Sequence, residues 1–410
     1  MPMPLVLFED RHVRHLYPLA LTRTAGDLVV GARTLIDVQR ESFYANDGLV
    51  LWTRPEVAAV TAQEHPEVLV NELPAHSGGV LLVNQRWLLR EGEVLDAVRA
   101  GASPGQPARA WRQGNAVVAA WLPEPPPDLF IRPVETLAPK GEAVDGVTLI
   151  RNLWDLIADL PARLAHDLDA LGGFGIQDGS VHASAIVPEP REVHIGEDAA
   201  IHPGVILNTE DGPIWIGAEA VIEEGAIVRG PAYIGPKAVV KAAARVDTSA
   251  IGYWSKVGGE VHASIVHSLS SKAHDGYLGS SYLGRWCNLG ADTNTSNLKN
   301  DYGEVTVYDA VAEDFVASGE QFVGLFMGDH SKCSINTMFN TGTVVGVFCN
   351  LFGSGFPPRH IAGFSWGGAD GLTPYRLDKA LRVAEAVMAR RERALTEADR
   401  ALLTALFAAR

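Results

Sequence analysis

The fold of the C-terminal half is decided by residues 216–252, which read IGAEAVIEEGAIVRGPAYIGPKAVVKAAARVDTSAIG. An aliphatic residue recurs at every sixth position, and an alanine follows each one four residues later. The aliphatic residues are Ile216, Ile222, Val228, Ile234, Val240 and Val246, and the alanines are Ala220, Ala226, Ala232, Ala238, Ala244 and Ala250. Neither an α-helix nor a simple strand selects one large and one small apolar residue in every six. A parallel β-helix of hexapeptide repeats does, because the aliphatic side chain points to the coil axis and only alanine fits the corner.

The repeat extends on both sides of this stretch. It begins earlier, at Ile195 and Ile201, and it resumes at Leu283 and Leu289. We therefore expect a β-helix over residues 176–365, with insertions that break its register near 252–280 and 294–332. A run of ordinary antiparallel hairpins is the alternative, but hairpins would not keep one phase through six repeats.

Residues 1–175 follow a different pattern, in which apolar runs alternate with polar or helical segments. The apolar runs are residues 5–8, 48–52, 80–84 and 116–122. Strands interleaved with helices predict an α/β, Rossmann-like layer domain.

Helices are expected on both sides of the β-helix. Residues 152–171 have a helical pattern that Gly172 ends, which predicts a connecting helix. Residues 366–410 form the third predicted domain, a helical cap over the last coil or a neighbouring subunit. Within it, Thr396 and Asp399 have the spacing of a capping pair for the last helix.

Composition excludes several classes of function. The chain has 34 Lys and Arg against 49 Asp and Glu, a net charge of −15, which argues against a nucleic-acid partner. No apolar run reaches the roughly 18 residues that a membrane span needs, so no membrane partner is expected. Cys287, Cys333 and Cys349 are odd in number and lack CxxC spacing, which fits neither a disulfide framework nor a zinc site. We expect a cytoplasmic protein.

Two polar segments interrupt the aliphatic scaffold. They are SKAHDGYLG at 271–279 and CNLGADTNTSNLKN at 287–300. Together they resemble the acetyltransferase half of the bifunctional glucosamine-1-phosphate acetyltransferase/N-acetylglucosamine-1-phosphate uridyltransferase family, which reads SKAGHLTYLG followed by NIGAGTITCNYDG. The whole chain is similar to a divergent, sugar nucleotidyltransferase-like branch of that family, through residues 21–35 and 353–368 among others. The resemblance implies a left-handed β-helix.

The resemblance also implies roles for these polar residues. His274 would be the general base that deprotonates a sugar amine as it attacks acetyl-CoA, a role that suits imidazole because it titrates near neutral pH. Tyr277 and Asn288 would orient hydroxyl and phosphate groups of the sugar, and Asn297 would contact the sugar or hold the base. Lys272 or Lys299 would pair with the sugar 1-phosphate.

A second polar island lies at residues 328–333, GDHSKC. Asp329, His330 and Lys332 would help bind sugar phosphate or CoA if this island lay beside the His274 loop on a neighbouring coil or subunit. A polar turn at a coil corner is the alternative.

The chain also departs from the family pattern. Where the family has VEMKK, residues 260–264 read EVHAS, so a phosphate-binding lysine is missing unless Arg245 or Lys256 replaces it. Histidines scattered along the β-helix suggest a zinc site as an alternative, because another hexapeptide family is a trimeric carbonic anhydrase with zinc-bound histidines. The scattered histidines are His182, His194, His202, His262 and His267. Because most of them stand at hexapeptide turn positions, we predict no metal site there.

The N-terminal region has a nucleotidyltransferase resemblance. Residues 14–37 are similar to the RLYPLTLTRPK...GGKPLI stretch of sugar-1-phosphate nucleotidyltransferases, which use Mg²⁺ when nucleotidyl transfer is active. Residues 8–13, FEDRHV, stand where that family has its glycine-rich phosphate loop, and VNQR at 83–86 is the nearest match to its metal-binding Gly-Asp. The site is therefore either reworked or inactive. The implied nucleotide-binding residues are Arg14, Arg23, Asp27 and Arg33, although Arg23 and Asp27 could instead form a structural ion pair.

We predict a transferase that modifies sugar phosphates for the cell envelope. It would N-acetylate an amino-sugar phosphate with acetyl-CoA, transfer a nucleotide to a sugar 1-phosphate to give a UDP-N-acetylglucosamine-like product, or do both. One alternative is a monofunctional nucleotidyltransferase with a structural or regulatory β-helix. Another is a non-catalytic nucleotide-sugar sensor or scaffold. By resemblance, we expect a homotrimer.

Overall fold

The protein forms two compact units. The structure is a computed structural model that describes residues 4–44, 48–74, 79–90, 92–138 and 141–410. The first unit holds the chain up to Asn152, apart from residues 17–19 and 29–32, which belong to the second unit together with residues 153–410.

The first unit is built on a seven-stranded sheet of order β3-β2-β1-β4-β7-β6-β8. Its strands are β1 (Leu5–Phe8), β2 (Leu49–Trp52), β3 (Leu69–Val70), β4 (Val80–Asn84), β6 (Arg109–Gln113), β7 (Ala116–Leu122) and β8 (Glu142–Ala143). Its α-helices are α1 (Leu35–Ser42), α2 (Pro55–Glu64), α3 (Glu93–Gly101) and α4 (Val134–Leu137), and β5 (Trp87–Leu88) pairs with β9 (Thr148–Leu149). The four predicted apolar runs are strands, which confirms the α/β prediction.

Both faces of this sheet are covered. All four residues of β1 are buried, and its neighbours β2 and β4 run parallel to it. Leu5 and Leu7 pack into one apolar cluster while Val6 and Phe8 pack into another, because successive side chains of a strand point to opposite faces. The sheet is thus the middle layer of its unit, and its functional groups stand at the ends of the strands.

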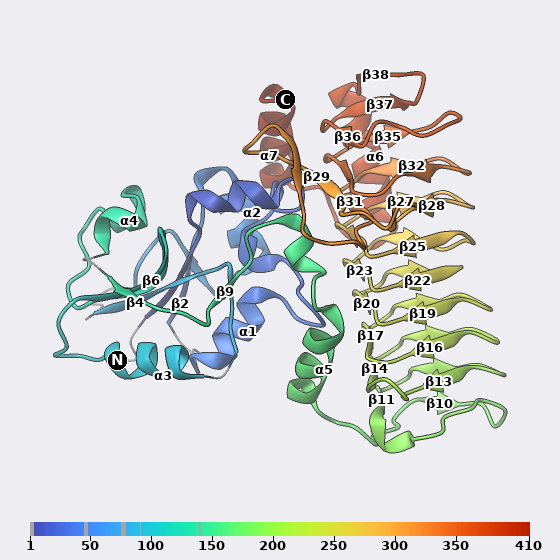
Figure 1. Cartoon of the computed structure of the whole chain (residues 1–410), viewed down its shortest axis with the longest axis horizontal. Coiled ribbons are helices and arrows are strands. Elements are labelled where there is room, and N and C mark those ends of the chain that lie inside the picture. Colours follow the sequence, from blue (N-terminus) through green and yellow to red (C-terminus); the bar gives the residue numbers. More distant parts are fainter. Residues whose placement is uncertain (1–3, 45–47, 75–78, 91, 139–140) are drawn as a thin grey trace. The chain divides into compact units, whose positions relative to one another are not determined.

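The second unit is a parallel β-helix, whose strands stack in successive coils (Figure 1). The longest sheet contains β10 (Ser180–Val181), β12 (Ala200–Ile201), β15 (Val221–Ile222), β18 (Val239–Val240), β21 (Lys256–Val257), β24 (Ser271–Lys272), β27 (Asn288–Leu289), β32 (Lys332–Cys333), β35 (Asn350–Leu351), β37 (Ser365–Gly368) and β38 (Gly371–Pro374). The second sheet contains β11 (Val193–Ile195), β14 (Ile214–Ile216), β17 (Ala232–Ile234), β20 (Ala250–Ile251), β23 (Ile265–Val266), β26 (Tyr282–Leu283), β31 (Leu325–Met327), β34 (Thr343–Val345) and β36 (His360–Ile361). The third contains β13 (Ile206–Asn208), β16 (Ile227–Arg229), β19 (Arg245–Asp247), β22 (Glu260–His262) and β25 (Tyr277–Gly279), and β28 (Asn294–Thr295) pairs with β33 (Met338–Phe339).

The hexapeptide pattern places side chains as predicted. All twelve aliphatic and alanine positions of the repeat are buried, and each is at most 2% exposed. Ile216 pairs in register with Ile234, so one regular coil takes 18 residues, or three hexapeptides. The predicted left-handed β-helix of hexapeptide repeats is therefore confirmed.

One of the two predicted insertions is wrong. From Ile234 to Ile251, Val266 and Leu283 the paired positions advance by 17, 15 and 17 residues, so the coils of the 252–280 region are shortened. The strands keep their pairing because the corners lose the residues, as at Gly259, which has a φ of +67°. The insertion within 294–332 is confirmed, because an antiparallel hairpin of β29 (Thr306–Asp309) and β30 (Asp314–Ala317) leaves the coil there.

Helices flank the β-helix in the sequence. The predicted connector begins as a 3₁₀ turn, Leu153–Leu156, and α5 (Leu160–Leu171) starts only after Asp159, a break that the helical pattern did not show. The chain ends with α6 (Leu377–Ala389) and α7 (Glu397–Ala408), and both hydrogen bonds of the predicted Thr396–Asp399 capping box are present. No helix in the described part of the chain is long and apolar enough to cross a membrane.

Candidate functional site

The first candidate site is the coil corner between β24 and β25. His274 is exposed there, and its side chain makes no hydrogen bond with any residue that the structure describes. The chain can turn at this point because Gly276 adopts a φ of +109° and lies against the next coil, where an added Cβ would stand 2.2 Å from the Thr293 carbonyl oxygen. The corner therefore presents an accessible imidazole on a tightly packed backbone.

Lys272 supports this corner from inside the β-helix. It occupies a position that other coils fill with an aliphatic residue, and it is only 1% exposed. Its Nζ donates hydrogen bonds to the carbonyl oxygens of Gly258, at 2.9 Å, and of His274, at 2.7 Å. Burial lowers the pKa of Lys272 to about 8, although Asp275 and Asp292 act in the opposite direction. Lys272 thus holds the backbone of His274 and does not face solvent, where the resemblance would have it pair with phosphate.

Tyr277 lies three residues further on, at the start of β25. Its backbone N–H donates to Asn294 Oδ1 at 2.9 Å, and its phenol hydrogen-bonds with Asn297. Asn297 in turn donates to Ser280 Oγ at 3.1 Å. Burial, together with the negative charge of Glu260, raises the pKa of Tyr277, so the phenol remains a hydrogen-bond donor at neutral pH. The structure brings these two predicted residues, Tyr277 and Asn297, into one polar network.

A cavity of about 290 Å³ lies beside Ser280 in the same unit. Its walls come from His262 and Ala263 of the preceding coil, from the segment before α5, and from residues 320–323 of the inserted excursion. Trp154 and Phe322 make part of the wall apolar, whereas Asp159 and Glu320 add carboxylates. A cavity with this mixed lining suits a small polar ligand.

Three of the other predicted residues lie apart from this network. Asn288 is exposed on β27 and pairs in register with Lys332 of β32, so both belong to a different sheet from Tyr277. The Nζ of Lys332 donates to the His330 carbonyl oxygen at 2.9 Å, and burial lowers its pKa to about 8. Lys299 hydrogen-bonds to the carbonyl oxygen of Glu304 within the excursion.

The second polar island occupies a different corner of the β-helix from His274. Asp329 is buried and accepts a hydrogen bond from the Arg285 backbone N–H at 2.8 Å. The His330 ring stacks between Trp286 and Phe348, with centroid separations of 5.9 and 4.4 Å. Within one chain, these contacts give the island the character of a structural turn.

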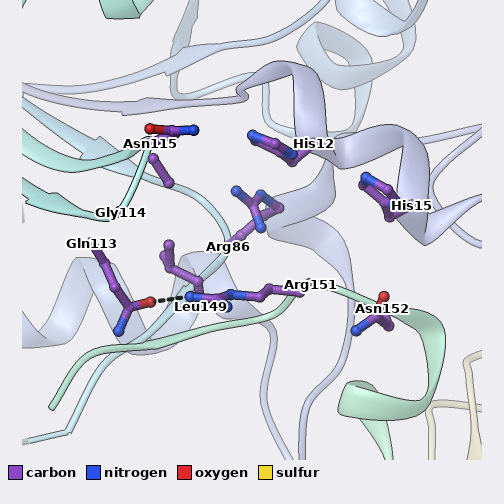
Figure 2. Close-up of a pocket in the computed structure, with 10 residues that line it drawn as sticks. His12, His15, Arg86, Gln113, Gly114, Asn115, Leu149, Arg151 and Asn152 are labelled. Atoms are coloured by element: carbon purple, nitrogen blue, oxygen red, sulfur yellow. Dashed lines mark hydrogen bonds between the residues drawn. The ribbon is translucent and has the colours of Figure 1, made fainter. Parts of the chain in front are cut away.

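The second candidate site lies in the N-terminal unit, at the carboxyl ends of β1 and β4. A cavity of about 380 Å³ opens there (Figure 2), and its polar lining residues are His12, His15, Arg86, Gln113, Asn115, Arg151 and Asn152. Arg151 donates a hydrogen bond to Gln113 Oε1 at 2.6 Å. Open α/β sheets bind ligands at this edge.

The four predicted nucleotide-binding residues do not line this cavity. Arg14 is exposed on the 3₁₀ turn Arg11–Leu16, and Arg33 forms an ion pair with Glu41. Arg23 is buried at 4% exposure. Asp27 is bonded to His65 Nε2 at 2.7 Å, an interaction that opposes the effect of burial and raises the pKa of His65.

The residues of this cavity were not predicted from the sequence, because the family pattern pointed to the arginines and the aspartate of residues 14–33 instead. His12 belongs to FEDRHV, the segment that replaces the glycine-rich loop, and Arg86 ends VNQR, which replaces Gly-Asp. The signal was present as a change of charge, since basic side chains stand where the pattern has glycine and aspartate. Asn115 and Arg151 carry no comparable signal, because only the fold brings them to this edge.

Neither candidate site assembles a metal-binding cluster from the residues that the structure describes. No group of three or more His, Cys, Asp and Glu side chains is placed to hold a metal ion anywhere in the described ranges. The scattered histidines have other partners, such as Glu224 for His202 and Asp247 for His262.

Comparisons with known proteins agree with the two-part architecture. Residues 5–173 match a family model described as sugar nucleotidyl transferase. The N-terminal domain is thus nucleotidyltransferase-like, as the sequence resemblance implied.

The chain is also similar to named bifunctional proteins. It is 34% identical over 154 residues to the "Bifunctional protein GlmU" of Methanocaldococcus jannaschii, which covers 33% of this chain and 35% of that protein. It is 30% identical over 158 residues to the "Bifunctional sugar-1-phosphate nucleotidylyltransferase/acetyltransferase" of Sulfurisphaera tokodaii, which covers 35% of this chain and 38% of that protein. The matched regions therefore span little more than a third of these relatives, at the modest identity expected of a divergent branch.

Two solved structures share only a weak likeness with the chain. The UDP-N-acetylglucosamine acyltransferase of Arabidopsis matches with 15% identity and a TM-score of 0.21, over 52% of this chain and 80% of that one. The enzyme of the same name from Campylobacter jejuni matches with 13% identity and a TM-score of 0.24, over 55% and 95%. These scores are too low to inform the sites.

Proposed function

We propose that the β-helix transfers an acetyl group from acetyl-CoA to the amine of an amino-sugar phosphate. The observation that carries this proposal is the exposed imidazole of His274, on a corner whose backbone is fixed by Lys272 and Gly276. The name of the Sulfurisphaera tokodaii relative includes an acetyltransferase, which supports the same chemistry.

In the proposed reaction, His274 is the general base. The amine nitrogen attacks the thioester carbonyl carbon and forms the new C–N bond, while the neutral imidazole accepts the proton that the amine loses. The C–S bond then breaks, and the leaving thiolate of CoA takes up the proton from the imidazolium. Lys272 acts as a positioning residue, since it holds the carbonyl group of His274 and not a substrate group.

Substrate binding is assigned to the neighbouring polar groups. Tyr277 and Asn297 are already hydrogen-bonded to each other and border the corner, so they would orient the hydroxyl groups of the acceptor. Asn288, which is exposed on β27, and Lys299 would contact the sugar phosphate or CoA. Because the family lysine is missing, Arg245, which lies two strands from Tyr277 on the same sheet, or Lys256 on β21 would take its place.

A thiol-release assay tests the proposal. Acetyl-CoA would be offered with a panel of hexosamine 1-phosphates and nucleotide amino sugars to the wild type, His274→Ala and a matched control, His182→Ala. His182 is exposed on the first coil, far along the chain from the corner. Loss of a general base should lower kcat by about 10²- to 10⁴-fold in His274→Ala only. A wild type that is silent on the whole panel, or a His274→Ala variant with full activity, would disprove the proposal.

Nucleotidyl transfer to a sugar 1-phosphate is the rival candidate function: the family match of residues 5–173 favours it, whereas the lack of a carboxylate in VNQR at 83–86 opposes it. It would need Mg²⁺ and would be measured as pyrophosphate release in the wild type and in Arg23→Ala. A monofunctional nucleotidyltransferase with a regulatory β-helix predicts pyrophosphate release that survives His274→Ala.

We further propose a cytoplasmic homotrimer. All three cysteines are free and buried, which suits a reducing compartment. Large apolar side chains are exposed on the last coils, as an interface between copies requires. They are Ile335, Met338, Phe352, Phe356 and Trp366. Light scattering of the full chain would give the mass of the assembly.

A further inference from the structure

The cavity at the carboxyl edge of the N-terminal sheet differs chemically from the rest of the protein. The whole chain has a net charge of −15. The polar part of the cavity lining, by contrast, consists of two imidazoles, two guanidinium groups and three side-chain amides, with no carboxylate among them. Figure 2 shows Arg86 in the cavity wall, with His12 and His15 on one side and Arg151 on the other. A local reversal of charge in a cavity of this kind indicates an anionic ligand.

The carboxylate of Asp10, which pairs with Arg86 of the cavity wall, is not available to a metal ion. Its Oδ1 accepts from Arg86 Nε at 2.9 Å and from the His12 backbone N–H at 3.0 Å. Its Oδ2 accepts from the other arm of the Arg86 guanidinium at 2.6 Å and from Asn84 Nδ2 at 2.9 Å. These four donors occupy the roughly four acceptor positions of a carboxylate.

The other acids at this edge do not replace it. Glu9 accepts hydrogen bonds from the backbone N–H groups of Ala25 and Arg54 and forms an ion pair with the Arg54 guanidinium. At the end of β4, residues 83–86, VNQR, are the nearest match to the metal-binding Gly-Asp of the nucleotidyltransferase pattern, and they contain no carboxylate. Magnesium needs carboxylate or phosphate oxygens with open positions. The described residues of this edge therefore do not fit the Mg²⁺ that nucleotidyl transfer requires.

The cavity offers donors of the kind that bind phosphate. The guanidinium of Arg151 is exposed and is oriented by its hydrogen bond to Gln113. The rings of His12 and His15 are stacked 5.9 Å apart, and the amide of Asn115 faces the same space. Guanidinium groups match the geometry of phosphate oxygens, and the cavity volume of about 380 Å³ suits a sugar phosphate or a nucleotide.

We propose that this cavity binds a small molecule bearing a phosphate group without a divalent cation, as a recognition site that performs no nucleotidyl transfer. In place of the metal ion, the exposed guanidinium of Arg151 and the imidazoles of His12 and His15 contact the ligand. Arg86, whose charge is paired with Asp10, forms the wall behind them. The proposal goes beyond the acetyl transfer proposed for the β-helix and does not depend on it.

The proposal also predicts how binding responds to pH. Burial lowers the pKa of His12, and Arg86, Arg11 and His15 act in the same direction, whereas Asp10 opposes them. A phosphate dianion in the cavity would favour the protonated imidazole, so binding should take up a proton. Affinity should therefore fall as the pH rises through the range in which the bound His12 loses its proton.

Calorimetric titration of the full chain tests the metal-free site. The probes are uridine 5′-diphosphate, glucose 1-phosphate and inorganic phosphate, each with excess EDTA and with Mg²⁺. We expect saturable binding of uridine 5′-diphosphate or glucose 1-phosphate, with a dissociation constant that EDTA changes by no more than about twofold. The probe that binds more tightly identifies the ligand as a nucleotide or a sugar phosphate. Binding only with Mg²⁺, or no binding of any probe, would overturn the proposal.

Two variants with the same change of charge locate the site. Arg151→Gln removes an exposed guanidinium of the cavity and should weaken binding by about tenfold or more. Arg132→Gln is the control, because Arg132 is also exposed in the N-terminal unit, pairs with Asp128 and does not line the cavity. Equal affinity of the two variants would refute the assignment, as would pyrophosphate release from UTP and N-acetylglucosamine 1-phosphate by the wild type.

Discussion

Replacing Lys272 by methionine tests whether the β-helix core carries a buried charge. The pKa of Lys272 is lowered from 10.5 to about 8 by burial, which corresponds to about 3 kcal/mol of destabilisation of the charged form. Against this, Nζ makes two hydrogen bonds to carbonyl oxygens, each worth about 1.5–3 kcal/mol when the donor is charged. Methionine fills similar space but makes neither bond, so we expect Lys272→Met to be about 1–2 kcal/mol less stable than the wild type at pH 7.

The pH dependence separates the charge from the hydrogen bonds. Because the folded-state pKa of Lys272 lies below its unfolded value, the cost of charging it is fully present below about pH 8 and disappears as the pH rises to about 10.5. The wild type should therefore gain about 3 kcal/mol relative to Lys272→Met over that range.

Urea unfolding of the full chain at several pH values, followed by circular dichroism, measures this gain. The control is Lys379→Met, which changes an exposed lysine on α6 and should stay parallel to the wild type. A constant stability difference between the wild type and Lys272→Met from pH 7 to 10.5 would refute the reasoning, because it would show that folding does not lower the pKa of Lys272.

Three further predictions concern other contacts. Arg86→Met leaves the buried Asp10 without its ion-pair partner and should lower the free energy of unfolding by about 3–5 kcal/mol, measured with urea. Adding Asp10→Asn to the same chain should restore part of the lost stability, and a double variant as unstable as Arg86→Met would contradict this prediction. The raised pKa of His65 gives stability that is fully present below about pH 6.5 and is lost as the pH rises through the folded-state pKa. Asp27→Asn should therefore destabilise the protein more at pH 6 than at pH 9. A destabilisation that does not change with pH would exclude the Asp27–His65 pair as its cause. Gly279→Ala places a Cβ 2.2 Å from the Tyr277 hydroxyl oxygen, so it should displace the phenol from Asn297 and lower the rate of acetyl transfer at least about tenfold. In a chain that already carries Tyr277→Ala, the same change should alter the rate little.

The sequence contained most of the fold because the hexapeptide rule is a packing rule. Each hexapeptide must place one aliphatic side chain in the axis and one small residue at the corner, and this need repeats at a fixed spacing that can be counted. The 252–280 region was misjudged because strand pairing survives when a corner loses residues. A break in the six-residue spacing indicates that a coil has changed length. Whether the coil has gained or lost residues is visible only in the pairing of Ile251 with Val266.

The candidate sites were less predictable than the fold. The family resemblance named Tyr277 and Asn297 separately, and only the structure shows that they are joined by a hydrogen bond. The direction of a side chain was not in the spacing, and Lys272 proved to point into the core where a surface cation was expected. In the N-terminal unit, the residues of the cavity come from segments as distant as His12 and Arg151, and only the strand order brings them together.

The last strand has a consequence for how the protein behaves at high concentration. Strand β38 pairs antiparallel with β37, although the other pairings along that sheet are parallel, and it ends at Pro374. An incoming coil from another molecule would need a parallel edge with free backbone donors, and a reversed strand that ends in proline does not supply one. Head-to-tail growth into filaments is therefore opposed along this sheet, and removal of residues 369–410 would expose the parallel edge on which such growth could start.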